Sequence, residues 1–223
     1  MIPGIVAWRS PSGTPPSPID TILGATSTVN VSVGTLTMAV PAGATTGDKL
    51  LVVLRSRADR SFTIPAGWTT LVSTAVPSGS SNNTDVRVYV LQKDYAGETN
   101  LSFVQSTTAA CSGMVILLRG QVGAVVTSFT SPVAYTKTEN SSYMLVLSFN
   151  NNYTTVTGTT PRVTSPTGYT QIGHSYFINS TEFYGIFADK KGLESSGLQS
   201  IAISWPGSTT SQRYAVAIEI KQP

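Results

Sequence analysis

The same order of short apolar segments occurs twice in this chain of 223 residues, with the copies about 100 residues apart. The matching segments are KLLVVLR (49–55) and YMLVLSF (143–149), VRVYVLQKD (86–94) and EFYGIFADK (182–190), and GMVILLRG (113–120) and RYAVAIEIK (213–221). Apolar side chains recur at every second position of these segments, which is typical of β-strands, and no stretch of helical length keeps a 3.6-residue period. The sequence therefore predicts an all-β chain that arose by duplication of one β-rich unit.

These patterns predict two tandem antiparallel β-sandwich repeats, of the jelly-roll or immunoglobulin-like kind, preceded by an extended proline-rich arm. The arm would span residues 1–27, the first repeat residues 28–121 and the second repeat residues 122–223. An alternative stays open, a single larger sandwich in which both repeats share one core. In the last strand, the alternation predicts that the apolar side chains face inward and that Glu219 and Lys221 face outward.

The arm stands apart from the rest of the chain because five prolines fall within its first 18 positions. Proline lacks a backbone donor and restricts φ, which predicts an extended backbone here rather than a helix or a central strand. Apolar side chains are also frequent, so we expect the arm to dock on a partner protein or on its own sandwich. The residues expected to make this contact are Ile2, Ile5, Trp8, Arg9, Ile19 and Ile22. Prolines stand where an export signal needs an apolar helix, which predicts folding in a cytoplasm.

One motif lies between a loop and a strand in each repeat, as IPAGWTTL (64–71) and as SPTGYTQI (165–172). Proline restricts φ where the strand begins, and glycine permits a bend or a positive φ. The aromatic residue that follows can then fold over the open end of a sandwich. We expect Trp68 and Tyr169 to plug the two cores; the alternative is that these rings are exposed and stack on a sugar.

The composition argues against an enzyme. Charged residues make up 11 % of the chain and the formal net charge is +3, without the clustered basic residues of a nucleic-acid-binding face. Cys111 and His174 are single residues of their kinds in different repeats, which excludes a multi-histidine metal site and disfavours a Cys–His nucleophile. No phosphate loop or nucleophile elbow is present, and no apolar run approaches the roughly 18 residues of a membrane helix. We expect no catalytic residue, cofactor, metal, nucleic-acid partner or membrane insertion.

Two stretches of the first repeat, residues 35–71 and 86–103, carry the spacing P-x-G-x-x-x-G-D-x-L followed by P-A-G-W-T. They resemble a β-rich family found in structural proteins of tailed phages and prophages. The second repeat departs from this pattern, because it lacks the Gly-Asp pair and has Tyr169 in place of the tryptophan. The matching positions are Pro41, Gly43, Gly47, Asp48, Leu50, Pro65, Gly67, Trp68 and Thr69, with Ala96 and Gly97 in a later turn.

The resemblance implies a structural or adhesion role in a bacteriophage virion. We expect a capsid decoration or head-fibre subunit, because the chain is short for a tail fibre and has no heptads for a trimeric stalk. Such a subunit is assembled into the virion in the host cytoplasm, with capsid or other virion proteins and further copies of itself as partners. The alternative is a tail-fibre or carbohydrate-binding receptor module that contacts host-surface glycans. The aromatic residues expected to serve that alternative are Tyr153, Tyr176 and Trp205.

Overall fold

The computed structural model describes residues 21–76, 86–152, 163–179, 182–192, 196–205 and 213–223. Within these ranges the chain forms thirteen β-strands and no helix, and the paired strands are antiparallel. The predicted all-β antiparallel class is confirmed. The strands are β1 (Ile22–Ala39), β2 (Lys49–Ser56), β3 (Phe62–Thr63), β4 (Thr69–Val76), β5 (Val86–Asp94), β6 (Asn100–Leu118), β7 (Gln121–Ser128), β8 (Val133–Lys137), β9 (Tyr143–Asn152), β10 (Thr170–Asn179), β11 (Glu182–Lys191), β12 (Gly197–Ile201) and β13 (Arg213–Lys221).

The two halves of the chain build sheets with the same strand order. The first sheet runs β1-β6-β2-β5-β4, with β3 paired to β6, and the second runs β7-β13-β9-β11-β10 when it is read from its β7 edge. Position by position, β7 takes the place of β1, β13 of β6, β9 of β2, β11 of β5 and β10 of β4. The duplication predicted from the sequence therefore appears in the topology.

Each half is a sandwich with a covering layer on the outer face of its main sheet. In the first half, register shifts between Asn30 and Thr35 bend β1, so residues 35–39 pair with residues 100–104 of β6, and this outer part of the sheet covers β2 and β5. In the second half β8 and β12 form a separate two-stranded sheet that does the same. The first outer core contains Leu36, Met38, Leu50, Val52, Leu54, Phe62, Leu91, Leu101, Phe103 and Leu117. The second outer core contains Val133, Tyr135, Met144, Val146, Val163, Phe187, Ile201, Ile203, Trp205, Ala215 and Ala217.

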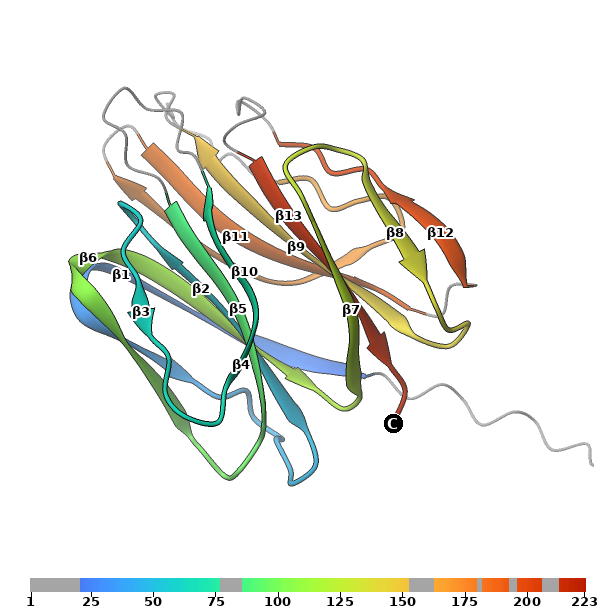
Figure 1. Cartoon of the computed structure of the whole chain (residues 1–223), viewed down its shortest axis with the longest axis horizontal. Helices are drawn as coiled ribbons and strands as arrows, with labels where there is room; N and C mark the ends of the chain where they lie inside the picture. The colour runs from blue at the N-terminus through green and yellow to red at the C-terminus, as the bar shows by residue number, and fades with distance from the viewer. Residues whose placement is uncertain (1–20, 77–85, 153–162, 180–181, 193–195, 206–212) are drawn as a thin grey trace, which may run out of the picture.

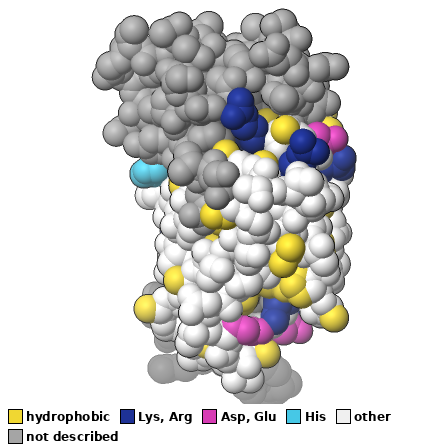
Figure 2. Space-filling view, turned by 90° about the vertical axis from the view of Figure 1, so that its left-hand side faces the viewer, with side chains coloured by type: hydrophobic (Ala, Val, Ile, Leu, Met, Phe, Trp, Pro, Cys, Tyr) yellow, Lys and Arg dark blue, Asp and Glu magenta, His cyan; other side chains and the backbone are white. Residues whose placement is uncertain are grey.

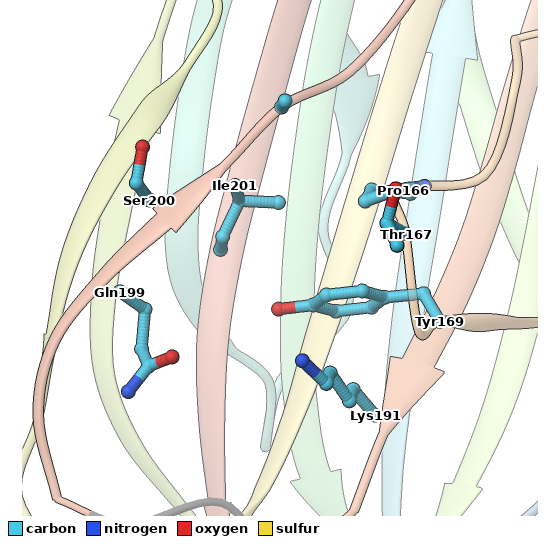
Figure 3. Close-up of a pocket in the computed structure, with 8 residues that line it drawn as sticks. Pro166, Thr167, Tyr169, Lys191, Gln199, Ser200 and Ile201 are labelled. Atoms are coloured by element: carbon cyan, nitrogen blue, oxygen red, sulfur yellow. The ribbon is translucent and has the colours of Figure 1, made fainter.

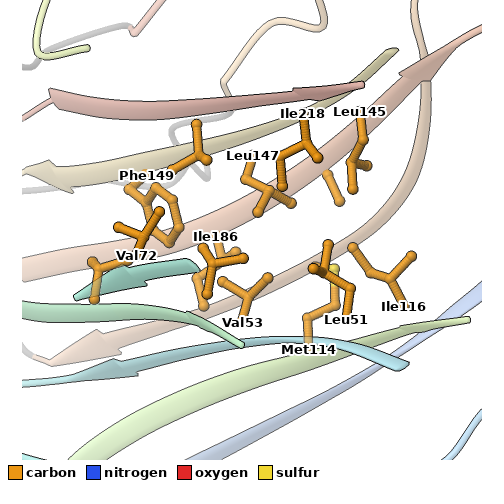
Figure 4. Close-up of a cluster of buried hydrophobic side chains, with 14 of the residues drawn as sticks. Leu51, Val53, Val72, Met114, Ile116, Leu145, Leu147, Phe149, Ile186 and Ile218 are labelled. Carbon is orange, nitrogen blue, oxygen red and sulfur yellow. The ribbon is translucent and has the colours of Figure 1, made fainter. Parts of the chain in front are cut away.

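The inner faces of the two main sheets pack on each other (Figure 1). Figure 4 shows Leu51, Val53 and Met114 of the first sheet pointing at Leu147 and Ile218 of the second. These side chains belong to one cluster of buried residues, the shared core, to which β2, β4, β5 and β6 contribute together with β9, β11 and β13. The two tandem sandwiches are therefore joined through a common core, which was the alternative left open by the sequence. Both faces of β2 are buried in consequence, and residues 51–56 all lie in the interior.

The arm is shorter than predicted. β1 begins at Ile22, which pairs with Leu118 of β6 and is 2 % exposed within the shared core. Residues 22–27 therefore belong to the first sheet, because the long β6 offers them a full pairing partner. Immediately before β1, the main-chain oxygen of Thr21 accepts a hydrogen bond from the Arg119 amide at 2.8 Å.

Candidate functional site: an aromatic–lysine pair in each half

The P-x-G-aromatic motif forms a tight turn at the start of β4 and again at the start of β10. Gly67 and Gly168 have φ angles of +86° and +81°, in the left-handed region that a side chain disfavours. In the second half the Tyr169 amide donates to the Pro166 carbonyl at 2.9 Å, the closing bond of a turn whose third residue has a positive φ. Each turn thereby aims its aromatic side chain at the outer core of its own half.

A lysine stacks on each of these aromatic rings. The Nζ of Lys93 lies 5.5 Å from the centroid of the Trp68 ring, and the Nζ of Lys191 lies 5.6 Å from the centroid of the Tyr169 ring. These distances are typical of cation–π contacts. The lysines are equivalent by register, because Lys93 pairs with Leu50 of β2 and Lys191 with Met144, the corresponding residue of β9. The pair is thus a feature of the repeating unit.

In the first half the pair is locked by further contacts. The Trp68 ring meets Phe103 edge-on at 5.4 Å and packs against the first outer core. Lys93 forms an ion pair with Glu98, whose second oxygen accepts the Ala96 amide at 2.9 Å. Hydrogen bonding from Lys93 is the largest cause that holds the pKa of Glu98 below its ordinary value. A nearby hollow of about 200 Å³ has Glu98 in its wall.

In the second half the pair lines an open hollow of about 100 Å³ (Figure 3). Tyr169 packs against the second outer core and keeps part of its surface exposed. The walls come from the turn, the end of β11, and β12 with the residue that follows it. They are Pro166, Thr167, Tyr169, Lys191, Gln199, Ser200, Ile201 and Ala202. The residues that line this hollow, all of them described, include no acidic side chain.

A buried hydrogen bond between Ser165 and Asp189 holds the start of the turn that carries Tyr169. Asp189 is completely buried and its Oδ1 accepts a hydrogen bond from the Ser165 hydroxyl at 2.5 Å. The register places Asp189 at the position of Leu91, a residue of the first outer core. Burial is the largest cause that raises the pKa of Asp189, and the Ser165 bond opposes it. The second half has therefore exchanged an apolar core position for a bond that holds the start of the Pro166 turn.

Two buried carboxylates hold the turns that precede β2 and β9. Asp48 accepts the Thr45 amide and hydroxyl at 2.9 and 3.0 Å and is clasped by Arg119, with Nε 2.8 Å from Oδ1. The hydrogen bond from Arg119 is the largest cause that lowers the pKa of Asp48. Asp48 belongs to the Gly-Asp motif, and the adjoining Gly47 has a φ of +97°. This part of the motif is therefore a turn anchor.

The carboxylate that holds the turn before β9 belongs to Glu219, and its position contradicts the prediction for this residue. Glu219 was expected to face outward, but its side chain is fully buried. Its carboxylate accepts the Ser142 hydroxyl at 2.6 Å, the Thr138 hydroxyl at 2.7 Å and the Glu139 amide at 2.9 Å. The alternation failed here because the residue faces the layer that covers the sheet, where a turn supplies donors. In the second half, the carboxylate that anchors the turn is thus contributed by the last strand.

The structure places the residues predicted to bind sugars in three different situations. Trp205 is 4 % exposed within the second outer core, with the Arg213 guanidinium 5.8 Å from its ring centroid. Its ring is covered, so the expected exposure is wrong for this residue. Tyr176 lies in β10 opposite Gly185, but its side chain is outside the described residues, as is all of Tyr153.

The structure describes only one of the residues that were expected to make the contacts of the arm. Ile2, Ile5, Trp8, Arg9 and Ile19 lie outside the described residues, and Ile22 is in the shared core.

Cys111 and His174 lie in different sheets. Cys111 is buried in the first outer core and burial raises its pKa to about 11, whereas the His174 ring is on β10 of the other sheet, with its centroid 6.3 Å from that of the Phe187 ring. Neither the described acidic residues nor the described Cys and His form a group that could hold a metal ion.

Sequence reasoning found Tyr169 but missed Lys191 and Gln199. The sequence match gave no signal for Lys191, because the matched segments QKD (92–94) and ADK (188–190) align Lys93 with Asp189, and Lys191 lies one residue beyond the segment. The sequence also held no signal that Gln199 lies beside the turn, because β12 belongs to the covering layer and approaches the turn only in the folded structure.

The chain matched no family model, no curated protein and no solved structure. In the part of the chain that is described, no helix is long and apolar enough to cross a membrane. The geometry therefore defines this protein only as a tandem β-sandwich with one aromatic–lysine pair in each half.

Proposed function

We propose that this chain is a structural subunit of a bacteriophage virion, a capsid decoration or head-fibre protein that is assembled into the particle in the host cytoplasm. Its partners are capsid or other virion proteins and further copies of itself. The motif residues that carry the resemblance support this proposal, because several have defined structural roles. Asp48 anchors one turn, Gly67 shapes another, and Leu50 lies in the first outer core.

The observation that carries the proposal is the continuous packing through the whole body. Three hydrophobic cores follow one another from the covering layer of the first half to that of the second. A protein interior is close-packed and has low compressibility, so such a body resists relative motion of its halves. Rigidity of this kind suits a protein that reinforces a shell or holds a fixed position on it.

The surface supports the same role. Figure 2 shows a side face on which uncharged polar side chains and backbone dominate, with a few small groups of charge. Charged residues are 11 % of the chain, about half the usual share. Contacts made through hydroxyl and amide groups depend less on ionic strength than contacts between charges, an advantage for a particle that is released into varied media.

The start of the described body provides the anchoring point. Ile22 is packed in the shared core and Thr21 is bonded to Arg119, so residues 1–20 are connected to a rigid frame. These residues carry Ile2, Ile5, Trp8, Arg9 and Ile19, apolar groups and one cation that suit a protein surface. In the proposed role this segment binds the capsid, and the sandwiches face outward.

The test removes residues 1–20 and leaves the body intact. The truncated protein should melt within about 2 °C of the full chain, which corresponds to less than about 1 kcal/mol for this size, and should no longer bind particles that lack the protein. A full-length variant with a Gly/Ser segment in place of residues 1–20 is the matched control and should behave in the same way. Normal decoration by either variant, or failure of both to fold, would overturn the role of the segment.

A second candidate function, a tail-fibre or receptor-binding module, is favoured by one observation, the hollow beside Tyr169. The hollow combines an aromatic ring with amide, hydroxyl and ammonium groups, the mixture found in sites for polar organic ligands.

A further inference from the structure

We propose that the hollow beside Tyr169 binds an acidic sugar unit, a hexuronic acid residue of a polysaccharide. This inference does not rest on the virion role, and purified protein is sufficient to test it. The site lies entirely on the second half, between the turn that begins β10 and the strand β12. Of the aromatic residues for which the sequence left sugar binding open, the site uses Tyr169, whereas Trp205 is covered.

The walls of the hollow have two chemical characters that a sugar also combines. Figure 3 shows the Tyr169 side chain extending from its turn toward β12, with Ile201 beyond it, Pro166 and Thr167 on one side and Lys191 on the other. The partly exposed tyrosine ring offers apolar surface to the C–H groups of a pyranose, and the buried Ile201 and Pro166 pack beside it. An amphipathic aromatic residue suits such a ligand, because its ring contacts carbon while its hydroxyl contacts water or oxygen.

Polar groups converge on the same space from separate elements. Thr167 comes from the turn, Lys191 from the end of β11, and Gln199 and Ser200 from β12. Hydroxyl and amide groups both donate and accept, which matches the hydroxyl groups of a sugar ring. Convergence of this kind distinguishes a binding site from a chance depression between side chains.

The edge of β12 adds main-chain groups. Among the described strands, β12 pairs only with β8, and residues 199–202, at the end of β12 and just after it, line the hollow. The edge of a sheet presents N–H and C=O groups in a row. Sugar hydroxyls can bond to such groups without any demand on side-chain geometry.

The preference for an acidic sugar follows from the charges. Lys191 is the charged residue among those that line the hollow, all of which are described. Its ammonium group carries three donors, so it can contact the Tyr169 ring and also donate to a ligand carboxylate, in a charge-assisted bond that is about twice as strong as a neutral one. The first-half hollow that has Glu98 in its wall is lined by neither Trp68 nor Lys93, so it is not an equivalent of this site.

The test is a titration of isotope-labelled protein with methyl β-D-glucuronide, followed by amide chemical shifts. We expect saturable shifts at Tyr169, Lys191 and residues 199–202, with a dissociation constant on the order of 1–10 mM, as for a ligand with few contacts. Methyl β-D-glucoside should bind roughly fivefold or more weakly, because it lacks the carboxylate. Inorganic phosphate should cause no saturable shift at these positions.

Matched variants separate the two contributions. Lys191→Met keeps the aliphatic stem over the ring and should weaken glucuronide binding about fivefold while leaving the glucoside unchanged. Tyr169→Leu should weaken both ligands. Lys93→Met, the same change in the first half, should alter neither. A melting curve of each variant checks that it folds, and Lys191→Met decides the matter if Tyr169→Leu does not.

Three outcomes would overturn the inference. The first is the absence of saturable shifts at the hollow with glucuronide. The second is phosphate binding as strong as glucuronide binding, which would make this an anion site without sugar recognition. The third is unchanged glucuronide affinity in Lys191→Met.

Discussion

Replacing Glu219 with leucine, the residue at the equivalent position 117 of the first half, should lower the free energy of unfolding by about 3 kcal/mol at pH 7. The carboxylate accepts bonds from two hydroxyl groups and two main-chain amides. Hydrogen bonds to a charged group contribute about 1.5–3 kcal/mol each, and a buried donor that loses its acceptor costs about 1–3 kcal/mol. The buried Ser142 hydroxyl would lose this acceptor but keeps the Glu139 carbonyl at 3.0 Å, and water can reach Thr138, so the loss stays well below the sum of the four bonds. The added apolar contact of leucine offsets a further part of the loss.

Glu219→Gln should cost less, about 1–2 kcal/mol, because the amide keeps the shape and one accepting oxygen but loses the charge. The control is Asp94→Asn, which removes a pair with Lys49 in which the Asp94 side chain is 79 % exposed. An exposed pair of this kind contributes less than about 1 kcal/mol. Urea unfolding followed by tryptophan fluorescence measures all three variants.

The pH dependence provides an independent check on the same residue. Burial by itself raises the pKa of Glu219, but hydrogen bonds from Ser142, Thr138 and Glu139 outweigh it, and the folded-state pKa lies below the ordinary value of 4.5. The stabilisation is therefore fully present above pH 4.5 and is lost as the pH falls through the folded-state pKa. The Gln variant should lose that part of the acid-induced decline. A leucine variant that loses less than about 1 kcal/mol, or a Gln variant with the wild-type acid profile, would refute the reasoning.

Three further predictions concern the shared core, a close backbone contact and a buried thiol. Residues 21–119 and 120–223, expressed separately, should aggregate or form loosely packed states in size-exclusion chromatography and near-UV circular dichroism, because each would expose its face of the shared core; two monomeric halves that melt cooperatively would contradict this. Gly120→Ala should destabilise the protein by more than about 2 kcal/mol, since its new methyl group would lie 2.2 Å from a main-chain oxygen and backbone cannot yield cheaply. Gly34→Ala, whose nearest contact would be 3.9 Å away, is the control and should change thermal stability little. Cys111 should not react with a thiol reagent at pH 8 until urea unfolds the chain, because burial raises its pKa to about 11; rapid reaction of the native protein would show that the first outer core opens.

Several features could be predicted because their signals are local. A period of two along β5 or β13 depends on neighbouring positions only, and the P-x-G-aromatic turn depends on the conformations of proline and glycine. The repeated order of such segments was sufficient to predict the duplication. The motif likewise predicted that the rings of Trp68 and Tyr169 would cover the cores of their own halves.

Other features could not be predicted because they depend on which layer covers a given face. Glu219 reads as an outward residue along its own strand, but its donors at residues 138–142 lie about 80 positions earlier. Trp205 reads as an exposed aromatic residue, but the covering layer buries it. Ile22 reads as part of the arm, but β6 is long enough to pair with it.

Alternation and turn chemistry act over a few residues, so the chain's local patterns are sufficient to specify the all-β class, the duplicated order of strands and the turns that aim one aromatic ring at each outer core. The shared core of the two halves and the meeting of Tyr169, Lys191 and Gln199 around a hollow arise from packing between distant segments. These residues come from three segments that approach one another when the β8–β12 layer closes over the second sheet. The burial of apolar surface that drives this packing is a non-directional force. The positions of the polar groups around the hollow therefore follow from how whole sheets pack.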